Sequence, residues 1–252
     1  MLALTGMVLK FSNMPWANFV ANLLGGPHTA GQIHRFGAFL TFGYFTFHLF
    51  TLIKTKINNH VPVSRFVFGK NSLMFNMQDI RDFGATIKWF FGKGPKPNYG
   101  RWTYWEKFDY MAVFWGIAVI GFSGLVLWFP VVFTKIFPGW LINVAQIIHS
   151  DEALLAVGFI FTIHFFNTHL RPDAFPMDTV IFTGLVPFDE FKKDRPREYK
   201  ELKDSGRLKK VMVKKEFKSW YYSTIRVFGF IFVAFGLILV GFIIYSMLFS
   251  YK

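Results

Sequence analysis

Long apolar segments with few charges are the feature that most limits how this chain can fold. A helix needs about 20 apolar residues to cross the hydrocarbon core of a bilayer. The chain of 252 residues has three clear runs of this kind and a fourth that polar residues interrupt. Charged residues make up only 17% of the sequence, below the roughly 25% of a soluble domain. The sequence therefore predicts an all-α integral membrane protein, with residues 1–252 forming one membrane-embedded helix bundle.

The apolar runs give the predicted spans. We expect spanning helices over residues 31–53, 110–134, 143–168 and 227–250, which together would form a four-helix core. Residues 1–12 are apolar too, but as a helix they rise only about 18 Å against a core of about 30 Å. We interpret them as the second half of a further helix that begins upstream, which would bring the number of spans from four to about five.

Basic residues are concentrated in two loops. Ten Lys and Arg lie between residues 54 and 107 and fourteen between 171 and 226, so that these loops hold 24 of the 28. Loops rich in Lys and Arg stay on the cytoplasmic side of a membrane. We therefore expect both loops to be cytoplasmic and the spans 31–53 and 143–168 to run parallel, from outside to inside. The net charge of +13 then reflects topology and attraction to anionic lipid, and we expect no nucleic-acid partner.

The first basic loop contains an amphipathic segment. In residues 75–94 the apolar side chains recur at helical spacing, with Lys and Arg opposite them. This pattern is typical of a helix that lies on a membrane surface, here the inner one.

Four histidines carry the functional prediction. His34 and His48 are 14 residues apart, and His149 and His164 are 15 apart, so each pair lies on roughly one face of its helix, about 21–22 Å apart along the axis. Since the two helices run parallel, His34 matches His149 in depth near the outside, and His48 matches His164 near the inside. Two neutral imidazoles at one depth suit the two faces of a haem b, whereas zinc prefers three or four ligands at one place. The chain has no cysteine, which excludes covalently attached haem and Cys-held iron–sulfur clusters.

Other polar residues lie near these positions. Arg35, next to His34, and Arg171 are placed to pair with haem propionates near the two surfaces. His169 follows His164 by five residues, about 140° around an α-helix, which makes it a poor iron ligand but a candidate for a quinone or propionate contact. Glycines that would let a flat macrocycle approach the backbone occur on the same helices and on the one between: Gly37, Gly43, Gly158, Gly116, Gly121 and Gly124.

Two carboxylates follow the outer histidine directly. Asp151 and Glu152 are expected about two turns into their helix, where a carboxylate is costly. One interpretation is that Glu152 or Asp151 exchanges a proton at an outer quinone site. The other is that a carboxylate near a helix start meets the helix dipole.

At the level of motifs, the runs AGQIHR…FHLF and HSDEALLA…IHFFNTHLRPDAFPMD resemble the di-haem cytochrome b membrane subunits of the formate dehydrogenase, hydrogenase and thiosulfate reductase type. The likeness is strongest to the versions that work with multihaem c-type cytochromes, and it covers residues 1 to about 190. It implies that His34 and His149 hold the outer haem. For the inner haem, many members of the family use a histidine of the first helix together with the residue that matches His164. Either His48 takes that place, as the spacing indicates, or a segment upstream supplies the ligand.

The resemblance also implies a function. The chain would carry electrons across a bacterial cytoplasmic membrane, between quinone or quinol and a periplasmic multihaem cytochrome c or iron–sulfur subunit, with two haem b as cofactors. The alternatives are a transporter whose intramembrane histidines conduct protons or metal ions, and a stand-alone transmembrane b-type reductase.

Overall fold

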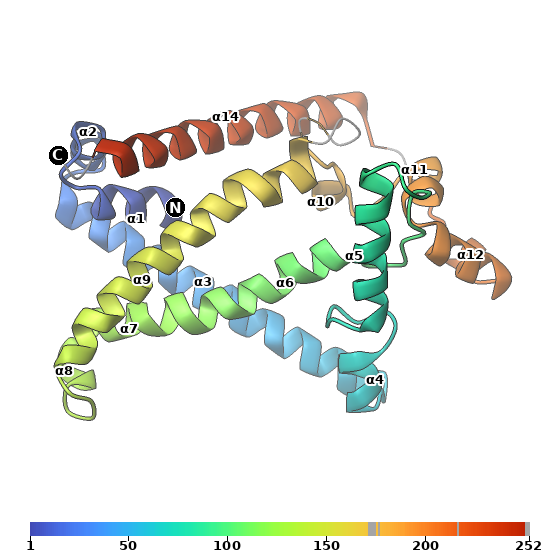
Figure 1. Cartoon of the computed structure of the whole chain (residues 1–252), viewed down its shortest axis with the longest axis horizontal. Helices are drawn as coiled ribbons and strands as arrows, with labels where there is room; N and C mark the ends of the chain where they lie inside the picture. The colour runs from blue at the N-terminus through green and yellow to red at the C-terminus, as the bar shows by residue number, and fades with distance from the viewer. Residues whose placement is uncertain (171–174, 176, 216, 250–252) are drawn as a thin grey trace. The chain divides into compact units, whose positions relative to one another are not determined.

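The computed structural model describes residues 1–170, 175, 177–215 and 217–249, and within these ranges the regular structure is helical throughout (Figure 1). The α-helices of the first half are α1 (Leu2–Lys10), α2 (Pro15–Leu23), α3 (Pro27–Asn58), α4 (Val63–Phe68), α5 (Met77–Phe90), α6 (Tyr104–Gly116), α7 (Phe122–Trp128) and α8 (Pro130–Phe133). Those of the second half are α9 (Trp140–Phe159), α10 (Val180–Thr183), α11 (Phe188–Asp194), α12 (Pro196–Asp204), α13 (Leu208–Val211) and α14 (Ser219–Phe249). Three π-helical turns interrupt this pattern: η1 (Ile117–Gly121), η2 (Ile160–His164) and η3 (Phe166–Leu170).

Four helical stretches are long and apolar enough to cross a membrane: Pro27–Asn58, Tyr104–Trp128, Leu141–Leu170 and Ser219–Phe249. The predicted all-α membrane helix bundle is thus confirmed. Each stretch begins before the predicted span, because the helix continues into polar residues that an apolar pattern does not mark. The second ends earlier than predicted. Its helix stops at Trp128 because Phe129 precedes Pro130 and adopts a non-helical conformation, as residues before proline tend to do.

The chain forms two compact units. The first consists of Met1–Thr51, Phe114–Asp178 and Arg226–Lys252, and the second of Leu52–Val113 and Thr179–Ile225. The first unit therefore holds most of each span. The second holds the loop segments together with the adjoining ends of three spans.

One face of α1 packs against the rest of the first unit. Met7 and Val8 on α1 are each 2% exposed. Met7 belongs to an apolar cluster that joins α1 and α2 to α9 and α14, with the members Met7, Phe11, Met14, Ala17, Val157, Leu239 and Ile243. On α2, the Trp16 ring stacks on Phe242, with centroids 4.9 Å apart, and its Nε1 donates to Ser246 Oγ at 2.8 Å. Residues 1–23 therefore pack as part of the bundle.

Ion pairs join the two basic loops within the second unit. Arg195, from the later loop, donates two hydrogen bonds to Glu106, at 2.9 and 2.5 Å. Lys96 pairs with Asp194 at 3.1 Å, and Arg197 with Asp82 at 2.8 Å. Both loops therefore lie at the same ends of the spans, so that α3 and α9 run in the same direction.

The topology can be tested with fusions. A reporter inserted within 56–105 or 172–220 should report the cytoplasm, and one inserted within 135–140 should report the opposite side. The ion pairs require the first two insertions to agree with each other. A different side for each would contradict the structure, and a reversal of all three would exchange the inner and outer ends.

Close packing of α14 against the π-helical stretch that follows α9 depends on one small residue. A Cβ atom at Gly236 would lie 2.6 Å from Phe161 Cδ1 and 2.8 Å from Phe165 Cε2. Small residues let spanning helices approach each other closely. We expect Gly236→Val to lower the stability of the purified protein in detergent by about 1–3 kcal/mol, the usual cost of overpacking. Thermal unfolding followed by circular dichroism measures this. The control is Gly241→Val on the same helix, where a Cβ meets no atom within 4 Å, and equal losses in both variants would contradict the packing.

Candidate functional site

The structure brings His34 and His149 together. Their ring centroids lie 6.1 Å apart with the ring planes at 84°, one ring projecting from α3 and the other from α9. These histidines are 115 positions apart in the sequence, and each is partly buried.

A backbone carbonyl orients the His149 ring. Nδ1 of His149 lies 2.9 Å from the carbonyl oxygen of Ile120, and Ser123 Oγ is at 3.4 Å. A carbonyl only accepts hydrogen bonds, so Nδ1 carries the proton and Nε2 keeps its lone pair. Metal-binding histidines are held in this way by a hydrogen bond from the other ring nitrogen. Ile120 belongs to the π-helical turn η1, a feature that often occurs at functional sites.

A threonine holds the His34 ring. Thr5 Oγ1 lies 3.0 Å from His34 Nδ1 and donates its own hydrogen to the carbonyl of Met1, also at 3.0 Å. With that hydrogen engaged, the threonine oxygen accepts from Nδ1 and leaves Nε2 of His34 with its lone pair. Both imidazoles of the pair are therefore fixed through Nδ1, and both present Nε2 as the nitrogen that can bind a metal.

Two glycines lie directly against the pair. A Cβ atom at Gly124 would come 2.9 Å from His149 Cε1, and one at Gly6 would come 3.2 Å from His34 Cε1. Of the predicted glycines, Gly124 alone is among these neighbours. A Cβ atom at Gly37 would lie close to Met1 and Leu2, and one at Gly121 close to Phe42. A Cβ atom at Gly116 would meet only Ile120, at 4.0 Å, and one at Gly43 or Gly158 would meet no atom within 4 Å.

The geometry of the pair fits one metal ion between two imidazoles. A metal–imidazole bond is about 2 Å long, and the nitrogen lies roughly 1 Å from the ring centre. Two rings bound on opposite sides of one ion would thus have centroids about 6 Å apart, as His34 and His149 have. The line through the two metal–nitrogen bonds would lie in both ring planes. The two planes can therefore be perpendicular to each other, as those of His34 and His149 nearly are.

The inner histidines have different surroundings. The His48 ring lies 6.5 Å from that of Phe114, which in turn packs against Phe45 at 5.2 Å. The His164 ring lies 6.4 Å from that of His169.

The prediction that His169 points about 140° away from His164 is wrong. It assumed an α-helix, but the chain here forms the π-helical turns η2 and η3. In a π-helix the hydrogen bonds run from residue i to i+5, so residues five apart lie nearly in line. The two imidazoles are therefore neighbours on one face. His169 is only 8% exposed.

The tautomer of His169 differs from that of the outer pair. The backbone N–H of Asp178 donates to His169 Nδ1 at 3.4 Å. Since Nδ1 accepts, the proton of the neutral ring is on Nε2, which makes it a donor. A donor nitrogen suits a carbonyl or carboxylate oxygen better than it suits a metal ion.

The carboxylates after His149 have separate partners. Lys10 on α1 pairs with Asp151 at 2.9 Å and also donates to Ser150 Oγ at 3.1 Å. Glu152 instead accepts from Trp115 Nε1 at 3.4 Å. Asp151 is thus committed to an ion pair, which leaves Glu152 as the better candidate for proton exchange.

The two predicted propionate partners are placed differently. The Arg35 guanidinium lies 5.8 Å from the ring centroid of Trp128, and its side chain is exposed. The position of Arg171 lies outside the described residues.

The sequence prediction missed several residues around the two rings, namely Ile120 and Ser123 beside His149 and three residues of α1. Thr5, Gly6 and Lys10 all belong to the short apolar run at the start, which the hydropathy pattern predicts only as part of a spanning helix. The available signal was two small residues in succession and one lysine within an otherwise apolar run.

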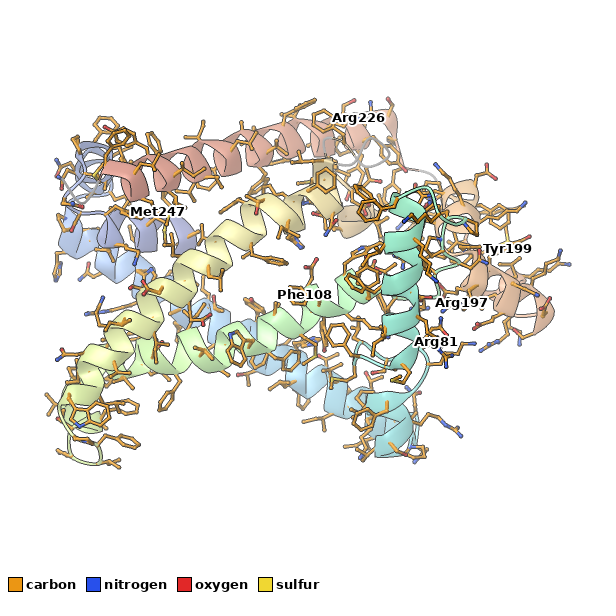
Figure 2. All side chains as sticks on the ribbon, in the orientation of Figure 1. Arg81, Phe108, Arg197, Tyr199, Arg226 and Met247 are labelled. Atoms are coloured by element: carbon orange, nitrogen blue, oxygen red, sulfur yellow. The ribbon has the colours of Figure 1, made fainter. Side chains whose placement is uncertain are left out.

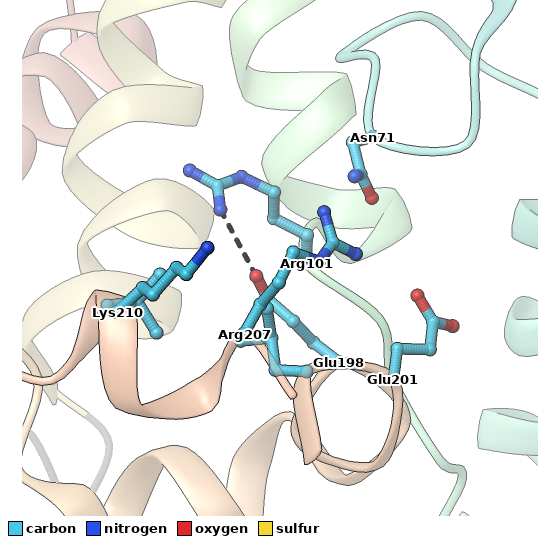
Figure 3. A pocket seen from close by; sticks show the side chains of 8 residues that line it. Asn71, Arg101, Glu198, Glu201, Arg207 and Lys210 are labelled. Atoms are coloured by element: carbon cyan, nitrogen blue, oxygen red, sulfur yellow. Dashed lines mark hydrogen bonds and ion pairs between the residues drawn. The ribbon is translucent and has the colours of Figure 1, made fainter. Parts of the chain in front are cut away.

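A separate hollow lies in the second unit (Figure 3). It has a volume of about 230 Å³, and Arg101 bridges to Glu198 across it at 3.1 Å. Its lining contains charged side chains and no histidine. It therefore belongs to the ion-paired loop surface and offers no ligand set for a haem iron.

Comparison with known proteins finds no matching family model, no matching curated protein and no matching solved structure.

Proposed function

We propose that this chain is a di-haem b-type cytochrome subunit that carries electrons across the membrane between quinone or quinol and a redox partner. The observation that carries the proposal is the pair His34 and His149. Their rings are 6.1 Å apart, and each is held through Nδ1 by a fixed acceptor. This separation supports a role in which the two imidazoles would hold one haem iron between them.

A bound haem would supply one-electron chemistry, and the chain would supply ligation, burial and orientation. Thr5 and the Ile120 carbonyl fix the two imidazoles, and hydrogen bonds of this kind make a ligating histidine more basic. Gly6 and Gly124 give the rings room beside the backbone. Arg35, at the outer end of α3, and Arg171 are proposed to pair with propionates.

The second haem is proposed to use His48 and His164. His48 lies in the second half of α3, and His164 lies in η2, the π-helical turn that follows α9. Each would supply one ligand to the second haem. His169, beside His164, presents a donor nitrogen, which supports the role of a hydrogen-bond donor to a quinone oxygen or a propionate. At the opposite end, Glu152 is proposed to exchange the proton that accompanies quinone chemistry.

The partner must hold the remaining redox centres. Without cysteine the chain cannot bind a covalent haem or a Cys-ligated cluster. Electrons would therefore leave or enter through a separate protein, proposed to be a periplasmic multihaem cytochrome c or an iron–sulfur subunit. The resemblance of the sequence motifs to bacterial cytochrome b subunits supports a location in the bacterial cytoplasmic membrane.

A metal transporter is less well supported. Among the described residues, no three His, Asp or Glu side chains gather at a point that would hold a metal ion, whereas sites built by protein ligands alone prefer three or four. A haem needs only two, because the porphyrin provides the rest.

The outer pair predicts a specific loss of cofactor. The purified protein should contain about two haems per chain, both extractable into acid acetone. His34→Ala and His149→Ala should each remove one haem, and the same one, because the two imidazoles share one iron. Haem stoichiometry and redox titration measure this.

The matched control is His28→Ala, which changes an exposed histidine at the start of α3 and should keep both haems. The loss of different haems from His34→Ala and His149→Ala would contradict the pairing. A colourless purified protein would exclude the whole proposal in favour of a transporter.

The inner pair predicts a second pattern. His48→Ala should lose the inner haem as completely as His164→Ala does, because each would remove one of its two ligands. His169→Gln should keep that haem and slow quinol oxidation, because it alters a donor beside the ligand. Retention of both haems at normal midpoint potentials in His48→Ala would show that another residue ligates the iron.

A further inference from the structure

The helix α5 in the first basic loop has an unusual distribution of polar and apolar residues. Its N-terminus is capped by Asn76, whose side chain accepts from the backbone of Gln78, while Asp79 accepts from the backbone of Asn76. Asp79 and Asp82, one turn apart, are 5% and 6% exposed. The acidic face of this helix is therefore its buried face.

Ion pairs explain why the acidic face points inward. Lys107, on α6, donates to Asp79 at 2.9 Å, and both side chains are almost fully buried. Arg197, on α12 and labelled in Figure 2, forms two hydrogen bonds with Asp82, at 2.8 and 3.3 Å. Gln78 donates a third hydrogen bond to the same carboxylate. Removing one partner of a buried pair is strongly destabilising, because it leaves a buried charge without compensation. These contacts fix the rotation of α5 about its own axis.

The opposite face of α5 is apolar and exposed. Its members recur at helical spacing and expose between 43% and 79% of their surface: Met77, Ile80, Phe83, Ile87 and Phe90. The sequence pattern predicted this stripe with basic residues opposite. The structure instead buries carboxylates opposite the stripe and leaves Arg81 and Lys88 exposed on the helix surface.

The position of α5 relates the stripe to the bilayer. The helix runs crosswise to α6, whose first turn it contacts through Asp79 and Lys107 (Figure 1). Since Tyr104–Trp128 is a spanning stretch, a helix crosswise to its beginning lies along the membrane surface. The adjoining ends of the other spans, at residues 52–58 and 219–225, belong to the same compact unit.

We propose that α5 is a membrane-surface anchor whose apolar stripe is immersed in the bilayer on the side of the two basic loops. The occupant of the stripe is lipid, because α5 is held against the first turn of a spanning stretch, at the boundary where the hydrocarbon begins. Arg81 and Lys88 lie among the headgroups and attract anionic phosphates. Through Lys107 and Arg197 the anchor holds the first turn of α6 and the helix α12 at a fixed depth.

The absence of cysteine makes this testable in the full chain. Single-cysteine variants Ile80→Cys, Phe83→Cys and Lys200→Cys each carry one nitroxide label, and all three positions are exposed, so that the label disturbs no core. The proteins are reconstituted into vesicles of phosphatidylcholine and phosphatidylglycerol. Collision rates of each label are measured with molecular oxygen, which concentrates in lipid, and with a water-soluble nickel chelate.

Labels at Ile80 and Phe83 should collide with oxygen in preference to nickel, at a ratio several-fold higher than the label at Lys200 on α12. Nickel access at Ile80 and Phe83 equal to that at Lys200 would overturn the proposal, because the stripe would then face water. Low access to both reagents would also overturn it, because a second copy of the chain or a partner protein would then cover the stripe. The measurement needs no haem, so its outcome is separate from that of the proposed function.

Discussion

Lipid offers no hydrogen bonds, and the rest of this structure follows from that constraint. Backbone groups inside a bilayer must be satisfied within the protein, which restricts the spans to helices. The same rule applies to an imidazole placed there. His34 and His149 each engage one ring nitrogen with a fixed protein oxygen. The other ring nitrogen of each histidine, Nε2, is then available to a metal. A metal ion bound between the two rings would give both Nε2 atoms a partner.

The ion pairs between the loops give the bundle its direction. Glu106 with Arg195 and Asp82 with Arg197 join segments that are about 90 to 115 positions apart in the sequence. Since these contacts keep both basic loops at one side, α3 and α9 must run parallel. In parallel helices, His34 in the first third of α3 and His149 in the middle of α9 reach the same depth, where their rings meet. The ion pairs between the basic loops and the meeting of His34 with His149 both follow from the parallel direction of α3 and α9.

Interruptions of regular helix geometry coincide with the candidate site residues. The turn η1 contains Ile120, whose carbonyl orients His149. The turns η2 and η3 contain His164 and His169 and bring their rings to one face. A π-helical turn has more residues per turn than an α-helix, so it rotates the side chains that follow it about the helix axis. A calculation that assumes an ideal α-helix therefore puts His169 on the wrong face. The spacing of His34 and His48 is free of this error because α3 is continuous.

The sequence by itself determined the helical spans, the shared side of the basic loops and the two helices that carry the histidines. Hydropathy and charge decide these features segment by segment, so no knowledge of contacts is needed. Only the tertiary structure decided that Thr5 holds His34, that Lys10 engages Asp151 and that α5 turns its carboxylates inward. Each of these depends on a partner at least 25 positions away in the sequence, and a pattern along one segment contains no information about which distant side chain will meet it.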